Sequence, residues 1–169
     1  SIELRRGTSI ALLLLRLTAF AGILFFFLTL ERLTEETLTR NNALDFDDFG
    51  GFGHPTVAIF PALLAIGEHT GATGRDLLEA YVVGCEIGLA LQHETKYKQM
   101  DKGFHSTAVI GRLACTAACA KLLKLDEHQT IMALGMAGSM SGGLIHNFGT
   151  MTKPLHAGLV GRDGVTAVQ

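Results

Sequence analysis

Charge, proline and cysteine are all scarce in this sequence, and each shortage excludes a class of protein. Charged residues make up 18% of the 169 residues, the net charge is -2, and no run of lysine or arginine occurs. Nucleic acid needs a concentrated basic surface, so we exclude it as a partner. Three prolines against 20 glycines, with few alternating runs of Val, Ile or Tyr, favour packed helices over sheets. The predicted fold class is therefore all-α.

The few cysteines argue against a disulfide framework or a zinc site. Cys85, Cys115 and Cys119 are odd in number, lie within apolar helical patterns and form no Cys-x-x-Cys pair. Cys115 and Cys119 share a helix face, where they fit as small hydrophobic core residues. We therefore predict no metal. This cysteine usage is typical of a reducing, intracellular compartment, and we expect a cytoplasmic protein.

Residues 1–42 form an atypical apolar segment. Arg5 and Arg6 precede an apolar run over residues 10–30, which Arg16 and a few small or hydroxylated residues interrupt. The run is long enough to cross a bilayer, although an arginine in mid-span costs roughly 2.5–3.5 kcal/mol. We keep three interpretations: a helix buried against the rest of the domain, a membrane anchor, or a segment foreign to the fold. An anchor would make the protein membrane-associated.

The rest of the chain has the pattern of packed helices. Thr73 and Asp126 are predicted N-caps, because Asp76 and Gln129 follow each by three residues in a capping-box arrangement. Apolar residues at three- and four-residue steps predict the helices themselves, over residues 56–68, 74–93, 105–124 and 126–143.

Two separate segments of this pattern carry reactive residues that could meet. A hairpin of the last two helices would bring the loop that follows it back towards His105. Thr152 is predicted to cap a further helix, with Pro154 in its first turn and with Lys153 and His156 close together. A lysine at a helix start attracts anions, and an imidazole gives or takes a proton near neutral pH. The arrangement predicts a site for a polyanionic small molecule at one end of a helical layer.

An acidic stretch precedes the first of these helices. Asp45, Asp47 and Asp48 are followed by a glycine-rich loop and by His54, just before the helix. Such crowded carboxylates repel one another unless they are solvated or capped, and their spacing matches no calcium loop. The loop glycines let the backbone approach a ligand, and a helix start favours a bound anion.

Four motifs together resemble those of a known family. They occur in the order Asp45-Phe46-Asp47-Asp48, His54-Pro55, Gly103-Phe104-His105 and Thr152-Lys153-Pro154-Leu155-His156-Ala157-Gly158. In this order they resemble the successive motifs of the MmgE/PrpD family, which includes 2-methylcitrate dehydratase and cis-aconitate decarboxylase. The resemblance covers about residues 43–168, so we treat residues 43–169 as one domain. Residues 1–42 do not share it.

The resemblance implies a helical domain that the family pairs with a smaller α/β lid domain, usually in a homodimer. It also implies chemistry without a cofactor on a small di- or tricarboxylic acid, by dehydration or decarboxylation. Matched by motif, His54, His105 and Lys153 correspond to catalytic positions. We assign proton transfer to His105, and carboxylate binding and charge neutralisation to Lys153 and His54. Substrate binding is assigned to Asp45, Asp48 and His156, the last from its position one helical step beyond Lys153.

The sequence departs from the family pattern in two respects. Phe49 follows Asp48, where the family commonly has a threonine, and the loop to His54 is about one residue short. The sequence also ends before the lid domain, so we expect the chain to be a fragment that carries only part of the family's active site. The competing hypothesis is a non-catalytic helical module, held at a membrane through residues 10–30.

Overall fold

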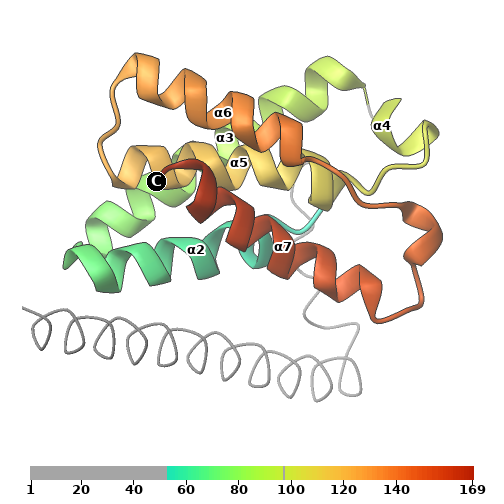
Figure 1. Ribbon diagram of the computed structural model, residues 1–169, viewed down its shortest axis with the longest axis horizontal. Helices are drawn as coiled ribbons and strands as arrows, with labels where there is room; N and C mark the ends of the chain where they lie inside the picture. Colours follow the sequence, from blue (N-terminus) through green and yellow to red (C-terminus); the bar gives the residue numbers. More distant parts are fainter. Residues whose placement is uncertain (1–52, 97) are drawn as a thin grey trace, which may run out of the picture. The chain divides into compact units, whose positions relative to one another are not determined.

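The computed structural model describes residues 53–96 and 98–169 (Figure 1). All of them belong to the unit Asp45–Gln169, the second of two units into which the chain divides. The apolar run at residues 10–30 and the acidic motif with Asp45 and Asp48 lie outside the described residues.

Within these ranges the structure is helical, and the predicted all-α class is confirmed. A single isolated bridge, between Phe104 and Leu144, is the only strand-like pairing among the described residues. The elements, in chain order, are α2 (Pro55–Thr70), α3 (Gly74–Thr95), α4 (Lys98–Asp101), α5 (Ser106–Leu122), α6 (Glu127–Met140), the 3-10 helix η2 (Ile145–Asn147) and α7 (Thr152–Ala167).

Helix α5 is the centre of the domain. It packs against α2, α3, α6 and α7, and Figure 1 shows it between α6 on one side and α2 and α7 on the other. Small side chains cover almost its whole circumference, which lets it be buried on every side. The core forms where the large apolar side chains of α2 and α7 meet this surface, chiefly Ile59, Leu63 and Val160.

Glycines allow two neighbouring helices to approach α5 closely. A Cβ added at Gly84 of α3 would lie 2.9 Å from the Cβ of Ala118, and one at Gly164 of α7 would lie 2.5 Å from the Sγ of Cys115. Both distances are too short for a real side chain. Cys115 and Cys119 are fully buried in this core, as the sequence predicts.

Both predicted capping boxes are present. The Thr73 hydroxyl accepts the N–H of Asp76 at 3.2 Å, and the Asp126 carboxylate accepts that of Gln129 at 2.8 Å. The cap predicted at Thr152 is wrong, because Thr152 is the first residue of α7 and Met151 is the N-cap. The cause is local: the hydroxyl of Thr150 accepts the N–H of Thr152 at 3.2 Å and so satisfies the start of the helix.

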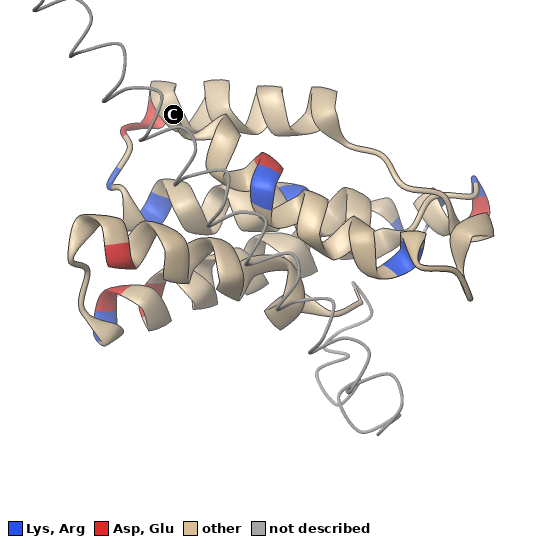
Figure 2. Ribbon diagram, turned by 60° about the horizontal axis from the view of Figure 1, so that its bottom comes forward, with Lys and Arg blue, Asp and Glu red and all other residues tan. Residues whose placement is uncertain are grey.

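Charged residues are sparse along this bundle. Figure 2 shows blue and red segments separated by long uncharged stretches, with no continuous stripe of one sign in that view. Among the described residues, no helix is both long and apolar enough to span a bilayer. In such a domain a few buried charges determine the local electrostatics.

Candidate active site

Two buried histidines meet at one end of the bundle. His105 is the N-cap of α5, and His156 lies in the first turns of α7. Their Nδ1 atoms are 3.0 Å apart, and the two residues are only 6% and 4% exposed. The structure thus brings together two side chains that are 51 residues apart in the sequence.

The loop after α6 holds this pair in place, as the predicted hairpin requires. The N–H of His105 donates to the carbonyl of Gly143 at 2.9 Å, and the N–H of Ile145 donates to that of Gly103 at 3.0 Å. Gly143 has a φ of +131°, and a Cβ there would lie 3.3 Å from Cε1 of His156 and 2.5 Å from the Cβ of Ala108. Glycine is required here both for its backbone conformation and for the space. The prediction that this loop returns to His105 is confirmed.

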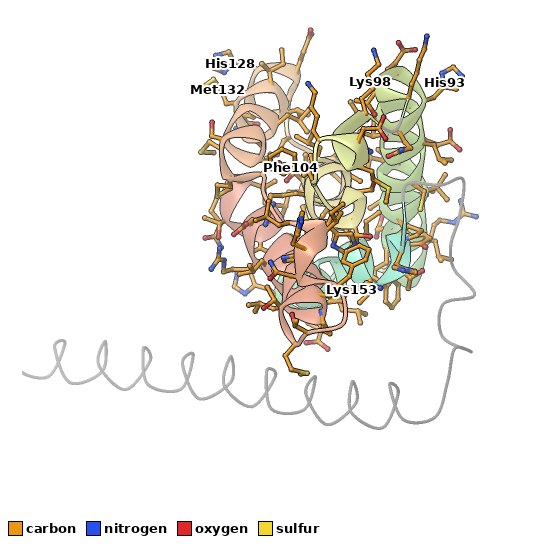
Figure 3. All side chains as sticks on the ribbon, turned by 90° about the vertical axis from the view of Figure 1, so that its right-hand side faces the viewer. His93, Lys98, Phe104, His128, Met132 and Lys153 are labelled. Atoms are coloured by element: carbon orange, nitrogen blue, oxygen red, sulfur yellow. The ribbon has the colours of Figure 1, made fainter. Side chains whose placement is uncertain are left out.

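Phe148 connects Lys153 to the histidine pair. The Phe148 ring stands nearly perpendicular to that of His105, with centroids 4.8 Å apart. The Nζ of Lys153 lies 4.9 Å from the centroid of the same phenyl ring, a cation–π distance. Figure 3 shows Lys153 and Phe104 within the end of the domain that faces the viewer. Lys153 is half-buried, whereas Phe148 is 43% exposed.

His54 reaches the same end of the domain from the start of α2. Its backbone N–H donates to Oγ1 of Thr107, at 3.4 Å. Gly53, with a φ of +101°, packs against that threonine hydroxyl, so the chain enters α2 alongside the first turn of α5. Positive charge on His54 contributes to lowering the pKa of His105.

Burial and surrounding positive charge keep the histidine pair neutral. The pKa of His105 is lowered to about 4, chiefly by burial; repulsion between a proton on His105 and positive charge on His156, Lys153 or His54 contributes to the same shift. The pKa of His156 is also lowered, by burial and by the guanidinium of Arg112. Neither ring is charged near neutral pH, so the short contact between them is a hydrogen bond through one shared proton.

A buried ion pair supports the site from behind. The Nε of Arg112 donates to Oδ2 of Asp163 at 2.8 Å, and both side chains are at most 4% exposed. Nη1 of Arg112 also donates to the carbonyls of Ala108 and Gly142, at 2.8 and 3.1 Å. The other carboxylate oxygen of Asp163 accepts from Arg162. Arg112 therefore ties α7 and the loop after α6 to α5.

The structure brings together four of the residues singled out in the sequence: His54, His105, Lys153 and His156. It adds Phe148, Arg112 and Asp163, which sequence reasoning missed. The signal for the last two was a charge within an otherwise apolar helical pattern; Phe148 gave no signal, because it lies in a loop.

Other polar features lie outside this group of residues. His69, His93 and His128 are exposed, and Figure 3 shows His93 and His128 projecting from the edges of the domain. In the part of the chain that the structure describes, no three His, Cys, Asp or Glu side chains are placed to hold a metal ion. A shallow concavity of about 420 Å³ is lined by none of the site residues; it is formed by Leu78, Glu79, Val82, Val83 and Lys121.

The fold and site define an all-α domain with a buried histidine pair and a lysine at one end. Comparison with known sequences identifies its class: the chain belongs to the MmgE/PrpD family, whose N-terminal domain matches residues 39–169. The predicted family is thereby confirmed.

Curated relatives of the chain are decarboxylases. It is 38% identical over 132 residues to the cis-aconitate decarboxylase of Mus musculus, covering 75% of this chain and 27% of that protein. Identity to the human cis-aconitate decarboxylase is 37% over 132 residues, with the same shares covered. For the Aspergillus terreus cis-aconitate decarboxylase it is 29% over 132 residues, covering 73% of this chain and 27% of that protein. The chain thus spans about a quarter of the length of these relatives.

Proposed function

We propose that this domain is the helical part of a cofactor-independent lyase that acts on a small di- or tricarboxylic acid, with decarboxylation of cis-aconitate as the leading candidate. The observation that carries the proposal is the buried His105–His156 pair beside Lys153. The named activity of the relatives supports the choice of cis-aconitate. Dehydration of an acid such as 2-methylcitrate, the other reaction of the family, is the alternative chemistry.

Substrate binding falls to the positive groups at this end. Lys153 lies in the first turn of α7, and His54 immediately precedes α2. Carboxylates that bind here would meet the positive charge of the Lys153 side chain and the positive ends of the two helix dipoles. Lys153 is held over Phe148 and loses little freedom when an anion arrives. We include Asp45 and Asp48 in the proposed substrate site and a homodimer as the assembly, on the family pattern.

Proton transfer falls to His105. In decarboxylation a carbon–carbon bond breaks, CO2 leaves, and the electron pair remains on the substrate as a carbanion that positive groups stabilise. A bound polyanion would counter the positive charges around His105 and raise its pKa from about 4, so that the ring carries the proton which ends the reaction. In dehydration the neutral ring would instead remove a proton next to a carboxylate.

Turnover by the 169-residue chain tests this function. The chain is incubated with cis-aconitate and CO2 release is measured; in parallel it is incubated with 2-methylcitrate and loss of water is followed. His105→Asn and Lys153→Met should each lower turnover about 100-fold, the typical contribution of a positioned acid or charge. His128→Asn, a change at an exposed histidine, is the control and should leave turnover unchanged.

Two results would count against the proposal. Turnover that is unaffected by both site variants would place the chemistry elsewhere in the chain. Saturable binding of cis-aconitate without any turnover would favour the non-catalytic helical module instead.

A further inference from the structure

We propose that His156 is a positioning residue that fixes the ring tautomer of His105: its unprotonated Nδ1 accepts the Nδ1–H of His105 and leaves Nε2 of His105 to exchange a proton with the substrate. This assignment replaces the substrate-binding role that the sequence suggested for His156. Its catalytic consequence rests on the proposed function, whereas the tautomer itself does not.

The contact geometry limits the possible arrangements. With Nδ1 atoms 3.0 Å apart, one nitrogen must carry the hydrogen and the other must present a lone pair. Two N–H groups pointing at each other would repel, and two lone pairs would forgo a hydrogen bond in a buried site. The pair therefore holds a single proton between its rings, and each ring's other nitrogen takes the opposite state.

Basicity determines which ring accepts. The pKa of His105 is lowered strongly, to about 4, so His105 is the weaker base of the pair and donates its Nδ1–H to His156 across the 3.0 Å contact. Arg112 lowers the pKa of His156 as well, and the Gly142 and Ala108 carbonyls fix that guanidinium in place. On the other side, His105 faces the end of the domain where Lys153 and His54 would bring an anion. With that anion bound, the pKa of His105 rises, and an added proton resides on His105 rather than on His156 beside the guanidinium. Once His105 is doubly protonated, only the lone pair of His156 can satisfy its Nδ1–H.

The proton balance of the proposed reaction requires the same tautomer. When the carbanion is protonated, the Nε2–H bond of His105 breaks, its electron pair stays on Nε2, and the carbanion's electron pair forms the new C–H bond. His105 is then neutral, with its hydrogen still on Nδ1 and bonded to His156. A proton from solvent restores the starting state. His156 keeps its own protons throughout, so it orients the acid without itself transferring a proton.

The rings have little freedom to leave this arrangement. Gly143 packs against His156, and Phe148 packs edge-on against His105. Both histidines are almost fully buried, so water does not compete for the shared hydrogen bond.

Nitrogen NMR of the full 169-residue chain at neutral pH tests the tautomer directly. The chemical shifts of the two ring nitrogens report which one carries hydrogen, and the His105→Asn spectrum assigns the His105 signals among the seven histidines. We expect His105 protonated at Nδ1 in the wild type and in His156→Asn, whose Oδ1 can accept in place of the His156 Nδ1. In His156→Leu the hydrogen should move to Nε2, the tautomer that a free histidine prefers. His128→Leu is the matched control and should leave the His105 signals in place.

Either of two results would overturn the proposal: hydrogen on Nε2 of His105 in the wild type, or an unchanged tautomer in His156→Leu. The wild-type spectrum decides the first once the His105 ring is assigned, and assignment through bonds from its own backbone amide serves if His105→Asn fails to fold. Where cis-aconitate is turned over, His156→Leu should lower kcat by roughly tenfold or more with KM little changed, and His156→Asn should retain most of it. A chain with the expected tautomer and no turnover would overturn the proposed function while supporting the positioning role.

Discussion

At the scale of single residues, His105 combines two properties that are opposed in most proteins. It is a titratable group, yet it lies 6% exposed at the N-cap of a helix and among positive charges. A ring in this position is held neutral because its protonation would bury a charge without a counter-ion. The same property makes it responsive to an anionic ligand, which would supply the missing negative charge.

The pH dependence of stability follows from this lowered pKa. The pKa of His105 is about 4 in the folded state, against an ordinary value of 6.5 in the unfolded chain. Between these values the unfolded state binds a proton that the folded state does not. The contribution of His105 to the free energy of unfolding is therefore fully present above pH 6.5, and the protein loses stability as the pH drops towards 4. We expect a loss of ~3 kcal/mol from this group, measured by urea unfolding at several pH values. His105→Asn should remove most of that slope, and an equal slope in the variant would contradict the assignment.

Arg112 and Asp163 should stabilise the fold as a mutually dependent pair. Asp163→Asn leaves a buried guanidinium without its carboxylate and should lower the free energy of unfolding by about 3 kcal/mol or more. Arg112→Met in the same chain should recover part of this loss, because the uncompensated charge is gone. Arg162→Ala is the control: that side chain is 62% exposed, and its removal should cost at most about 1 kcal/mol. If Asp163→Asn and Arg162→Ala lowered the free energy of unfolding equally, the buried pair with Arg112 would not be the more important one.

At the scale of elements, the loop between α6 and α7 is as important as the helices it joins. It carries Gly143 and Phe148, and it pairs with Gly103 and His105 at the start of α5. Through this pairing, the hairpin of α5 and α6 holds the rings of His105 and His156 in place. A change of loop geometry should therefore act on the site as well as on stability.

Adjacent glycines in this loop provide a matched comparison. Gly143→Ala would force a side chain into a backbone with a φ of +131° and against both Ala108 and His156. We expect it to lower the free energy of unfolding by more than about 2 kcal/mol. A Cβ at Gly142 meets nothing within 4 Å, so Gly142→Ala should change stability by less than about 0.5 kcal/mol. Thermal unfolding of the two variants measures the difference, and similar melting temperatures would show that the loop adapts.

The sequence predicts the features of this domain that are local and fails for those that are not. Capping boxes at Thr73 and Asp126 require residues three apart, and the helices require only periodic spacing, so both were predictable. The partnership of Arg112 with Asp163 spans 51 residues and depends on how α5 and α7 cross. No sequence pattern specifies that crossing. The same holds for Phe148, whose position depends on the path of a loop.

The candidate site shows the same division. His54, His105 and Lys153 were identified because their motifs occur in the family order, and the structure brings all three to one end of the domain. What the motifs did not predict is the contact between His156 and His105. The His156 ring is 4% exposed, its Nδ1 lies 3.0 Å from that of His105, and Gly143 packs against it.

At the scale of the whole molecule, the domain is a bundle around α5 with its reactive groups gathered at one end. The family match over residues 39–169 and the decarboxylase relatives agree with this arrangement. The chain spans 27% of the length of the Mus musculus relative, so we propose the activity of that protein for this chain and do not infer it from the identity. We propose that this end of the bundle recognises a polycarboxylate.

Calorimetric titration of the 169-residue chain with cis-aconitate measures this recognition. We predict saturable binding of one molecule per chain, weakened at least about tenfold in Lys153→Met and in His105→Asn, and unchanged in His128→Asn. Proton uptake should accompany binding near neutral pH, because the bound anion raises the pKa of His105. Absence of binding by the folded chain, or equal affinity in the wild type and both site variants, would contradict recognition of a polycarboxylate at this end of the bundle.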